Sequence, residues 1–140
     1  MTSTTYLQQA NTSILTLVQI ETKEALESVS EIAAVPGVDV LFVGPFDLGN
    51  NIGHPVIDGV MSSQLQSSIE NVLAASKKAG KKAGIFCTSA EQSRHYAEMG
   101  FDMISVATDV IILQASVMST VHAAKGGKGE AEKPRGGYGR

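Results

Sequence analysis

Several features are scarce in this 140-residue sequence, and each absence excludes a class of protein. There is one cysteine, Cys87, so no disulfide can form within the chain and a reducing compartment is expected. No apolar run approaches the roughly 20 residues that span a bilayer, so we expect no membrane partner. The first residues lack a basic segment followed by an apolar one, which is the pattern of a secretory signal. These absences favour a cytoplasmic protein.

An excess of charge of either sign is also missing. The chain has 11 basic and 14 acidic residues, and its net charge of -3 gives no electrostatic reason to expect a nucleic-acid partner. Hydrophobic residues make up 43% of the chain, which is typical of a globular domain. At this length we expect one folded domain over residues 1–125. The remaining residues, 126–140, are rich in glycine and lysine without periodicity, which predicts a disordered tail.

Apolar runs and amphipathic segments alternate along the chain. After a short helix that ends near residue 10, the pattern predicts four strands, each followed by a helix, with Thr22, Ser89 and Asp109 as helix N-caps. The expected strands cover residues 15–20, 38–43, 83–87 and 103–107, and the expected helices cover residues 23–34, 62–78, 90–99 and 109–124. This alternation predicts right-handed βαβ units, a parallel sheet and therefore the α/β class.

The expected sheet looks incomplete. Its apolar strands are typical of a (β/α)8 barrel, but four units make only half of such a barrel. A half-barrel exposes two unpaired sheet edges, which favour association with another chain. We therefore expect either part of a larger chain or a subunit that pairs with something, such as a homo-oligomer.

Polar side chains follow the first two expected strands at the point where each strand ends. Gln19 and Glu21 end the first, and the second breaks at Gly44 and Pro45 and places Asp47 on a loop over residues 44–55. The carboxyl ends of parallel strands are where ligands bind in α/β proteins. Two carboxylates there indicate a hard divalent cation. The alternative is that both carboxylates cap the helices that follow them.

Two motifs resemble a known family. The segments QIET (residues 19–22) and VPGVDVLFVGPFDL (residues 35–48) resemble the metal-dependent class II pyruvate aldolases. These are the 4-hydroxy-2-oxoheptanedioate (2,4-dihydroxyhept-2-ene-1,7-dioate) aldolases, which are related to the citrate lyase β-subunit. KKAGIFCTS (residues 81–89) and MGFDMISVATD (residues 99–109) resemble the last strands of that family. The resemblance covers residues 6–124 and implies strands 5–8 of a TIM barrel of the phosphoenolpyruvate/pyruvate superfamily, that is, a C-terminal half-barrel.

The resemblance also implies roles for individual residues. Glu21 and Asp47 match the carboxylates that ligate a divalent metal, Mg²⁺, Mn²⁺ or Co²⁺, and Gln19 matches a side chain that contacts the pyruvate moiety. The backbone N–H groups at Phe46 and Asp47 match donors to the carboxylate of pyruvate, with Gly44 and Pro45 allowing the main chain to approach the ligand. The implied reaction cleaves 4-hydroxy-2-oxo acids to pyruvate and an aldehyde through a metal-stabilised enolate.

One part of the family pattern has no counterpart. The histidine base and the enolate-stabilising arginine of the family lie in the first half of the barrel, so no catalytic residue is assigned in this sequence. His54 follows the metal loop but matches no catalytic position of the family. Three hypotheses remain open: a truncated aldolase that is weakly active alone, an inactive module that binds metal and oxo-acid, and an oligomerisation fragment.

Overall fold

A computed structural model describes residues 1–127 of the chain. Its centre is a four-stranded sheet in the order β1-β2-β3-β4, in which every neighbouring pair is parallel. The strands are β1 (Leu17–Ile20), β2 (Val40–Val43), β3 (Lys82–Phe86) and β4 (Met103–Ser105). The helices are α1 (Ser3–Ser13), α2 (Lys23–Glu27), α3 (Val29–Ala34), α4 (Pro45–Asn51), α5 (Ser63–Lys78), α6 (Ala90–Met99) and α7 (Asp109–Ala124). The expected α/β class with a parallel sheet is confirmed, whereas the tail predicted for residues 126–140 lies almost wholly outside the described residues.

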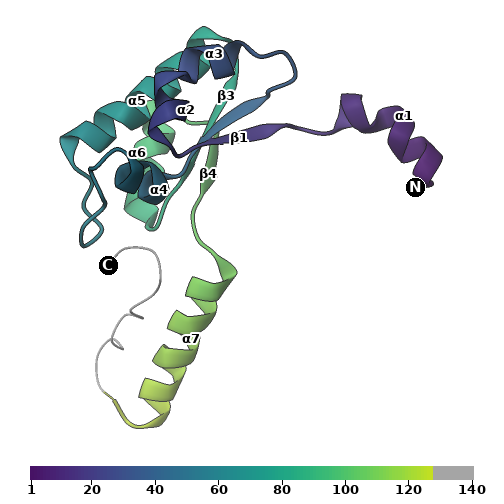
Figure 1. Ribbon diagram of the computed structural model, residues 1–140. Helices are drawn as coiled ribbons and strands as arrows, with labels where there is room; N and C mark the ends of the chain where they lie inside the picture. The colour runs from purple at the N-terminus through teal and green to yellow at the C-terminus, as the bar shows by residue number, and fades with distance from the viewer. Residues whose placement is uncertain (128–140) are drawn as a thin grey trace.

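The helices between the strands, α2 to α6, gather on one side of the sheet (Figure 1). Alternate strand residues point to that side and are buried there with the apolar stripe of α5. The strands contribute Ile20, Leu41, Val43, Ala83 and Ile85, and α5 contributes Leu65, Ile69, Val72 and Leu73. On the opposite face, Leu17 and Met103 at the two outer strands are about two-fifths exposed (42% and 41%). The sheet therefore has one packed face and one open face within the described chain.

Helix caps agree with the sequence in most places. The predicted caps Thr22 and Ser89 are confirmed, since each side chain accepts a hydrogen bond from a backbone N–H three residues later, at the starts of α2 and α6. Ser62, predicted as the first residue of a helix, is the N-cap of α5 and makes the same kind of bond. The expected cap at Asp109 is wrong by one residue, because Thr108 is the N-cap of α7. Asp109 is already helical, and its Oδ1 accepts from the N–H of Val110, 2.8 Å away.

Two expected elements are wrong. The helix predicted over residues 23–34 is divided at Ser28 into α2 and α3. The loop predicted after Gly44 begins with the helix α4, so Asp47 lies on a helix. Pro45 is the first residue of α4, where its missing N–H costs no hydrogen bond, and Leu48 is fully buried. Burial of Leu48 therefore stabilises a helix in a segment whose Gly and Asn content is typical of a loop.

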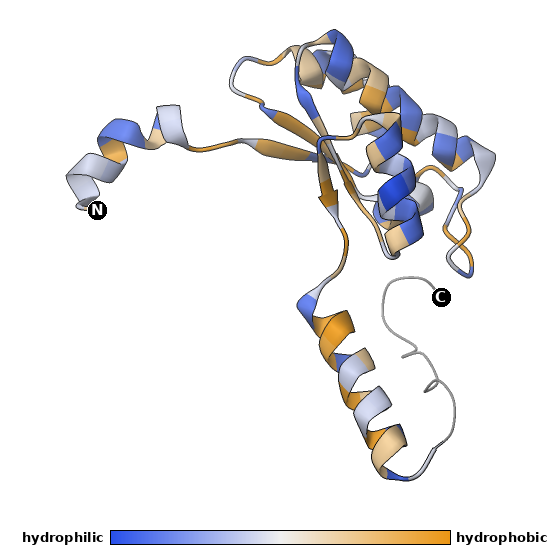
Figure 2. Ribbon diagram, turned by 180° about the vertical axis from the view of Figure 1, so that it is seen from behind, coloured by the Kyte–Doolittle hydropathy of each residue, from blue (hydrophilic) through white to orange (hydrophobic). Residues whose placement is uncertain are grey.

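The first and last helices project away from the body (Figure 1). Neither α1 nor α7 contributes a buried residue, although α7 carries several apolar residues, the orange segments of this helix in Figure 2. Its exposed side chains are Val110, Ile112, Leu113, Val117, Met118 and Val121. Within residues 1–127, no helix combines the length and apolar character needed to cross a membrane. Residues 1–127 therefore leave apolar surface on α7 uncovered.

Candidate functional site

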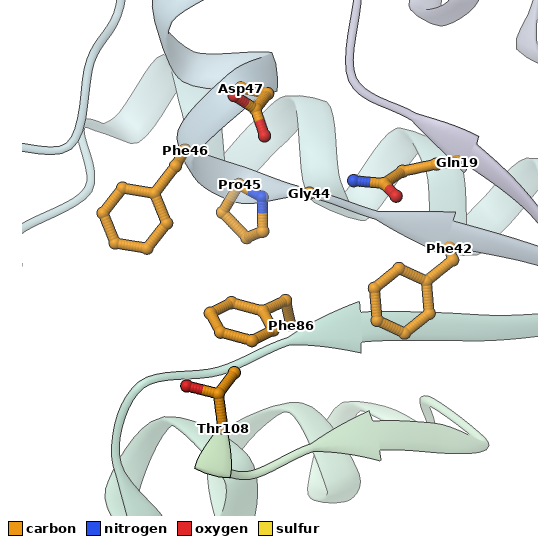
Figure 3. A pocket seen from close by; sticks show the side chains of 8 residues that line it. All are labelled: Gln19, Phe42, Gly44, Pro45, Phe46, Asp47, Phe86 and Thr108. Atoms are coloured by element: carbon orange, nitrogen blue, oxygen red, sulfur yellow. The ribbon is translucent and has the colours of Figure 1, made fainter. Parts of the chain in front are cut away.

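The site begins with a contact between two side chains at the end of β1. Gln19 Nε2 donates a hydrogen bond to Glu21 Oε2 over 2.7 Å. Glu21 is the first residue after the strand, and its neighbour Thr22 caps α2, so this carboxylate is not the helix cap that the alternative interpretation required. Because the amide nitrogen of Gln19 is engaged by Glu21, its amide oxygen is turned towards the adjoining pocket, as Figure 3 shows.

Gly44 supplies the space in which this pair lies. A Cβ atom at Gly44 would stand 2.6 Å from Gln19 Nε2 and 3.6 Å from Glu21 Oε2. Its backbone angles, φ -99° and ψ 90°, are accessible to any residue, so the position needs a small residue and not an unusual conformation. Gly44 therefore allows side chains from β1 to approach the end of β2.

Asp47 enters the site from the first turn of α4. Its position there suits a negative charge, because the N-terminal end of a helix carries a partial positive charge. The N-cap of α4 is Gly44, which has no side chain, so the capping alternative is wrong for Asp47 as well. Among residues 1–127, no side chain or backbone group forms a hydrogen bond or an ion pair with the exposed Asp47 carboxylate. It is therefore available to a ligand.

Two hollows meet at Asp47. An inner pocket with a volume of about 170 Å³ opens on the uncovered side of the sheet (Figure 3). It is lined by Gln19, Phe42, Gly44, Pro45, Phe46, Asp47, Phe86 and Thr108. An outer cleft is lined by Glu21, Thr22, Asp47, Asn50 and Asn51. The structure thus brings the five predicted substrate-contacting residues into one pocket and both predicted metal ligands into one cleft, with Asp47 common to the two.

Three pocket residues were missed from the sequence, namely Phe42, Phe86 and Thr108. Phe42 and Phe86 belong to the alternate set of strand residues that faces away from the helices, and Thr108 follows the last strand. The period of two in the strands could have indicated the two rings, although their apolar character suggested core positions. His54 lines neither hollow. Its backbone N–H donates to the carbonyl of Gly49 over 2.7 Å, which closes the turn after α4.

The donor atoms at this site fit a hard divalent cation. Two carboxylates and an amide oxygen are all oxygen donors, which Mg²⁺ and Mn²⁺ prefer. No group of three or more His, Cys, Asp or Glu side chains that could enclose a metal occurs within residues 1–127. A cation at Glu21 and Asp47 would therefore take its other ligands from water or from a bound acid, which is the usual coordination of Mg²⁺ in enzymes.

The groups with altered acidity lie away from these hollows. Burial raises the pKa of the Cys87 thiol, against a smaller lowering by the Ser93 hydroxyl, so the thiol stays protonated at neutral pH. Burial also raises the pKa of Tyr96 to about 12. Cys87 is therefore a buried core residue whose protonated thiol is unsuited to act as a nucleophile.

Comparison with known proteins gives consistent matches. The family model described as HpcH/HpaI aldolase/citrate lyase matches residues 2–115. A hydroxypyruvate/pyruvate aldolase of Chromohalobacter salexigens is 40% identical over 121 residues, which are 86% of this chain and 47% of that protein. A 4-hydroxy-2-oxo-heptane-1,7-dioate aldolase of Shigella sonnei is 34% identical over 92% of this chain and 48% of its own length.

The same similarity holds for a solved structure. An HpcH/HpaI aldolase/citrate lyase family protein from Burkholderia cenocepacia superposes with a TM-score of 0.77 at 37% identity. The superposition covers 86% of this chain and 46% of that protein. The chain therefore spans about half the length of the relatives that it matches.

Proposed function

The chain belongs to the HpcH/HpaI aldolase/citrate lyase family, and from this premise we propose that it carries the metal-binding and oxo-acid-binding end of a metal-dependent aldolase. The proposed reaction cleaves 4-hydroxy-2-oxo acids to pyruvate and an aldehyde. One observation carries the proposal. Gln19, Glu21 and Asp47, from two successive strand–helix units, gather around Gly44 at the carboxyl ends of β1 and β2.

In this proposal each residue of the site has a definite task. Glu21 and Asp47 hold Mg²⁺, Mn²⁺ or Co²⁺. When bound, the cation supplies a Lewis acid that stabilises negative charge on the 2-oxo group while the bond between C3 and C4 breaks. The Gln19 amide orients the oxo-acid, and backbone N–H groups at Phe46 and Asp47 bind its carboxylate.

The rings of Phe42 and Phe86 line the inner pocket next to Gly44 and Pro45. We assign them the role of excluding water from the carbon chain of the bound acid. Low water content strengthens the electrostatic interactions that hold the acid and the cation.

The two hollows offer no histidine or arginine side chain for the proton-transfer step. We therefore propose that this chain, taken alone, binds an oxo-acid better than it turns one over, since a missing general base costs roughly 10²- to 10⁴-fold in rate. The same observation favours a second candidate function, an inactive module that binds metal and oxo-acid, and an aldol-cleavage assay distinguishes the two.

The uncovered surfaces support a further part of the proposal, that the chain works as a homo-oligomer. In the part of the chain that the structure describes, the sheet has a free edge at β1 and another at β4, and α7 exposes apolar side chains along its length. Exposed edges and apolar faces of this kind favour association with another chain. We also propose a cytoplasmic location, in which the single thiol of Cys87 stays reduced.

Titration of Mn²⁺ and then pyruvate into the purified chain tests the site. We expect pyruvate binding that requires the metal. Glu21→Ala and Asp47→Ala should each weaken Mn²⁺ binding by more than about 100-fold, because even residues that only support a metal ligand contribute roughly 10- to 100-fold. Glu24→Ala is the matched control, since Glu24 is an exposed carboxylate on α2 that lines neither hollow.

The contradicting outcome is equally clear. If the folded wild-type chain binds neither Mn²⁺ nor pyruvate, the proposed site is wrong for this chain. If Glu24→Ala weakens Mn²⁺ binding as much as the two site variants do, the effect is one of overall charge and the assignment of Glu21 and Asp47 fails.

A further inference from the structure

The two carboxylates of the proposed metal site lie beyond the part of the chain that strand pairing holds in register. The ladder between β1 and β2 ends with Ile20 opposite Val43. Glu21 is one residue past this pair on its strand, and Asp47 is four residues past it, within α4. The separation of the carboxylates therefore depends on how the start of α2 is held relative to α4.

A single side chain joins these two elements. Asn51, in the last turn of α4, accepts a hydrogen bond at Oδ1 from the backbone N–H of Lys23, 2.7 Å away. Within residues 1–127 this is the side-chain hydrogen bond that links α4 to the start of α2. Lys23 is the first residue of α2 and lies two residues after Glu21.

Asn51 is also well placed relative to the other carboxylate. It follows Asp47 by four residues, so the two side chains lie on the same face of α4. Both line the outer cleft together with Glu21. One helical turn therefore carries a proposed metal ligand at one end and, at the other end, the group that fixes the backbone beside the second ligand.

We infer that Asn51 is a positioning residue of the proposed metal site, which holds the Glu21 backbone at a fixed distance from Asp47 through its bond to Lys23. The inference rests on the proposed function, because it presumes that Glu21 and Asp47 bind the cation together. Side chains that orient metal ligands without touching the metal commonly contribute roughly 10- to 100-fold to metal affinity. The bond to Lys23 lies at the surface, so we expect an effect near the lower limit of that range.

Four variants of the full chain test the inference. Asn51→Ala removes the acceptor, and Asn50→Ala is the matched control, since Asn50 lines the same cleft and forms no side-chain hydrogen bond in the described structure. Asn51→Asp keeps an acceptor oxygen at the same distance along the side chain. Asn50→Asp adds the same charge to α4 without that bond, and so measures what the charge alone does to cation affinity.

Two measurements are made on each variant: Mn²⁺ affinity by calorimetry, and hydrogen exchange of the Lys23 amide by NMR in the presence of Mg²⁺. For Asn51→Ala we expect roughly tenfold weaker Mn²⁺ binding and faster exchange at Lys23, with an unchanged melting temperature. Asn50→Ala should behave as wild type. Asn51→Asp should retain slow exchange at Lys23 and bind Mn²⁺ at least as tightly as wild type.

Three results with the variants would overturn the inference alone. The first is Mn²⁺ binding by Asn51→Ala that equals wild type. The second is an equal loss in Asn51→Ala and Asn50→Ala, which would mean that the cleft responds to any truncation. The third concerns two gains in Mn²⁺ affinity, that of Asn51→Asp over Asn51→Ala and that of Asn50→Asp over wild type. If the first gain is no larger than the second, the added charge alone explains the recovery. Absence of Mn²⁺ binding in the wild type would overturn the proposed function as well, whereas the other results leave it standing.

Discussion

At the scale of single residues, the site depends on one contact and on one missing side chain. Gln19 reaches Glu21 because Gly44 leaves room for its amide group, and a Cβ at that position would stand 2.6 Å from the amide nitrogen. The Gln19 side chain is flexible and exposed, so it can move aside at little cost to the fold. A change at Gly44 therefore allows the contact to be removed while the fold is kept.

We expect Gly44→Ala to displace the Gln19 amide from Glu21. The displaced amide would then lose its proposed contact with the oxo-acid, which is worth about 1 kcal/mol and corresponds to roughly fivefold weaker pyruvate binding in the presence of Mn²⁺. The melting temperature should change little, because φ at Gly44 suits alanine. Calorimetric titration of pyruvate measures the affinity, and thermal unfolding followed by circular dichroism measures the stability.

A double-mutant cycle tests this explanation, with Gly44→Ala, Gln19→Ala and the variant that carries both changes. If Gly44→Ala acts through Gln19, the two changes together should cost no more than Gln19→Ala alone. Additive losses would contradict the explanation and would show that the alanine methyl group disturbs the pocket directly.

At the scale of elements, acidic residues lie at both ends of the strands but differ in their hydrogen-bond partners. At the amino ends they join neighbouring strands. Asp39 accepts the N–H of Thr16 over 2.7 Å, and Asp102 accepts the N–H of Ala83 over 3.1 Å while pairing with Lys82 over 2.7 Å. At the carboxyl ends, Asp47 has no such protein partner within the described residues. Asp39 and Asp102 therefore stabilise the sheet at its amino end, whereas Asp47 remains available for a ligand at the other end.

The pair of Asp102 and Lys82 predicts a pH dependence of stability. The hydrogen bond from Lys82, followed by that from the Ala83 N–H, holds the pKa of Asp102 below its usual value. A carboxyl whose pKa is lower in the folded state stabilises the fold above its unfolded pKa of about 3.9, and this stabilisation is lost as the pH falls through the folded pKa. Because the Asp102 side chain is 36% exposed, we expect less than about 1 kcal/mol at neutral pH.

Urea unfolding of wild type and Asp102→Asn at pH 7 and pH 3 measures this contribution. Asp102→Asn should be the less stable protein at pH 7, and the difference should shrink at pH 3. Asp109→Asn is the control, because the Asp109 side chain bonds only to its neighbour Val110 in the described structure. A difference that stays constant between the two pH values would contradict the role of the Asp102 charge.

At the scale of the whole molecule, residues 1–127 cover one face of the sheet and leave the other open. The helices α2 to α6 bury the packed face, whereas Leu17 and Met103 stay partly exposed on the other, and α7 projects from the body without a buried residue (Figures 1 and 2). The chain also spans about half the length of its relatives. Exposed apolar surface of this extent is typical of a chain that has a partner.

We therefore predict that the purified chain self-associates as its concentration rises. Replacing Leu113 and Val117 with glutamate should reduce association, since both are exposed apolar residues one turn apart on α7. Thermal unfolding of the body should be unaffected, because α7 buries nothing in it. Light scattering coupled to size exclusion measures the association.

The matched control for this prediction places glutamates at Gln114 and Ser119, which are exposed polar positions of the same helix. This variant carries the same added charge as the first and should associate like wild type. A wild-type chain that stays monomeric at every accessible concentration would contradict the proposed assembly.

The sequence alone determined most of the fold and named the residues of the candidate site. Four strands, their parallel order and the caps at Thr22 and Ser89 follow from periodicity and from capping chemistry, which act over a few neighbouring residues. Gln19, Glu21 and Asp47 could be singled out because the ends of strands can be read from local breaks such as Gly44 and Pro45. Their roles stay predictions until ligand binding is measured.

Only the tertiary structure decided the rest. The segment after Gly44 is a helix because Leu48 is buried, the pocket is completed by Phe42, Phe86 and Thr108, and Asn51 reaches Lys23 across 28 residues of sequence. Each of these features depends on which segments the parallel register places side by side. Local propensity carries no information on contacts between distant segments, because they form only when the strands pair and the helices pack against one face of the sheet.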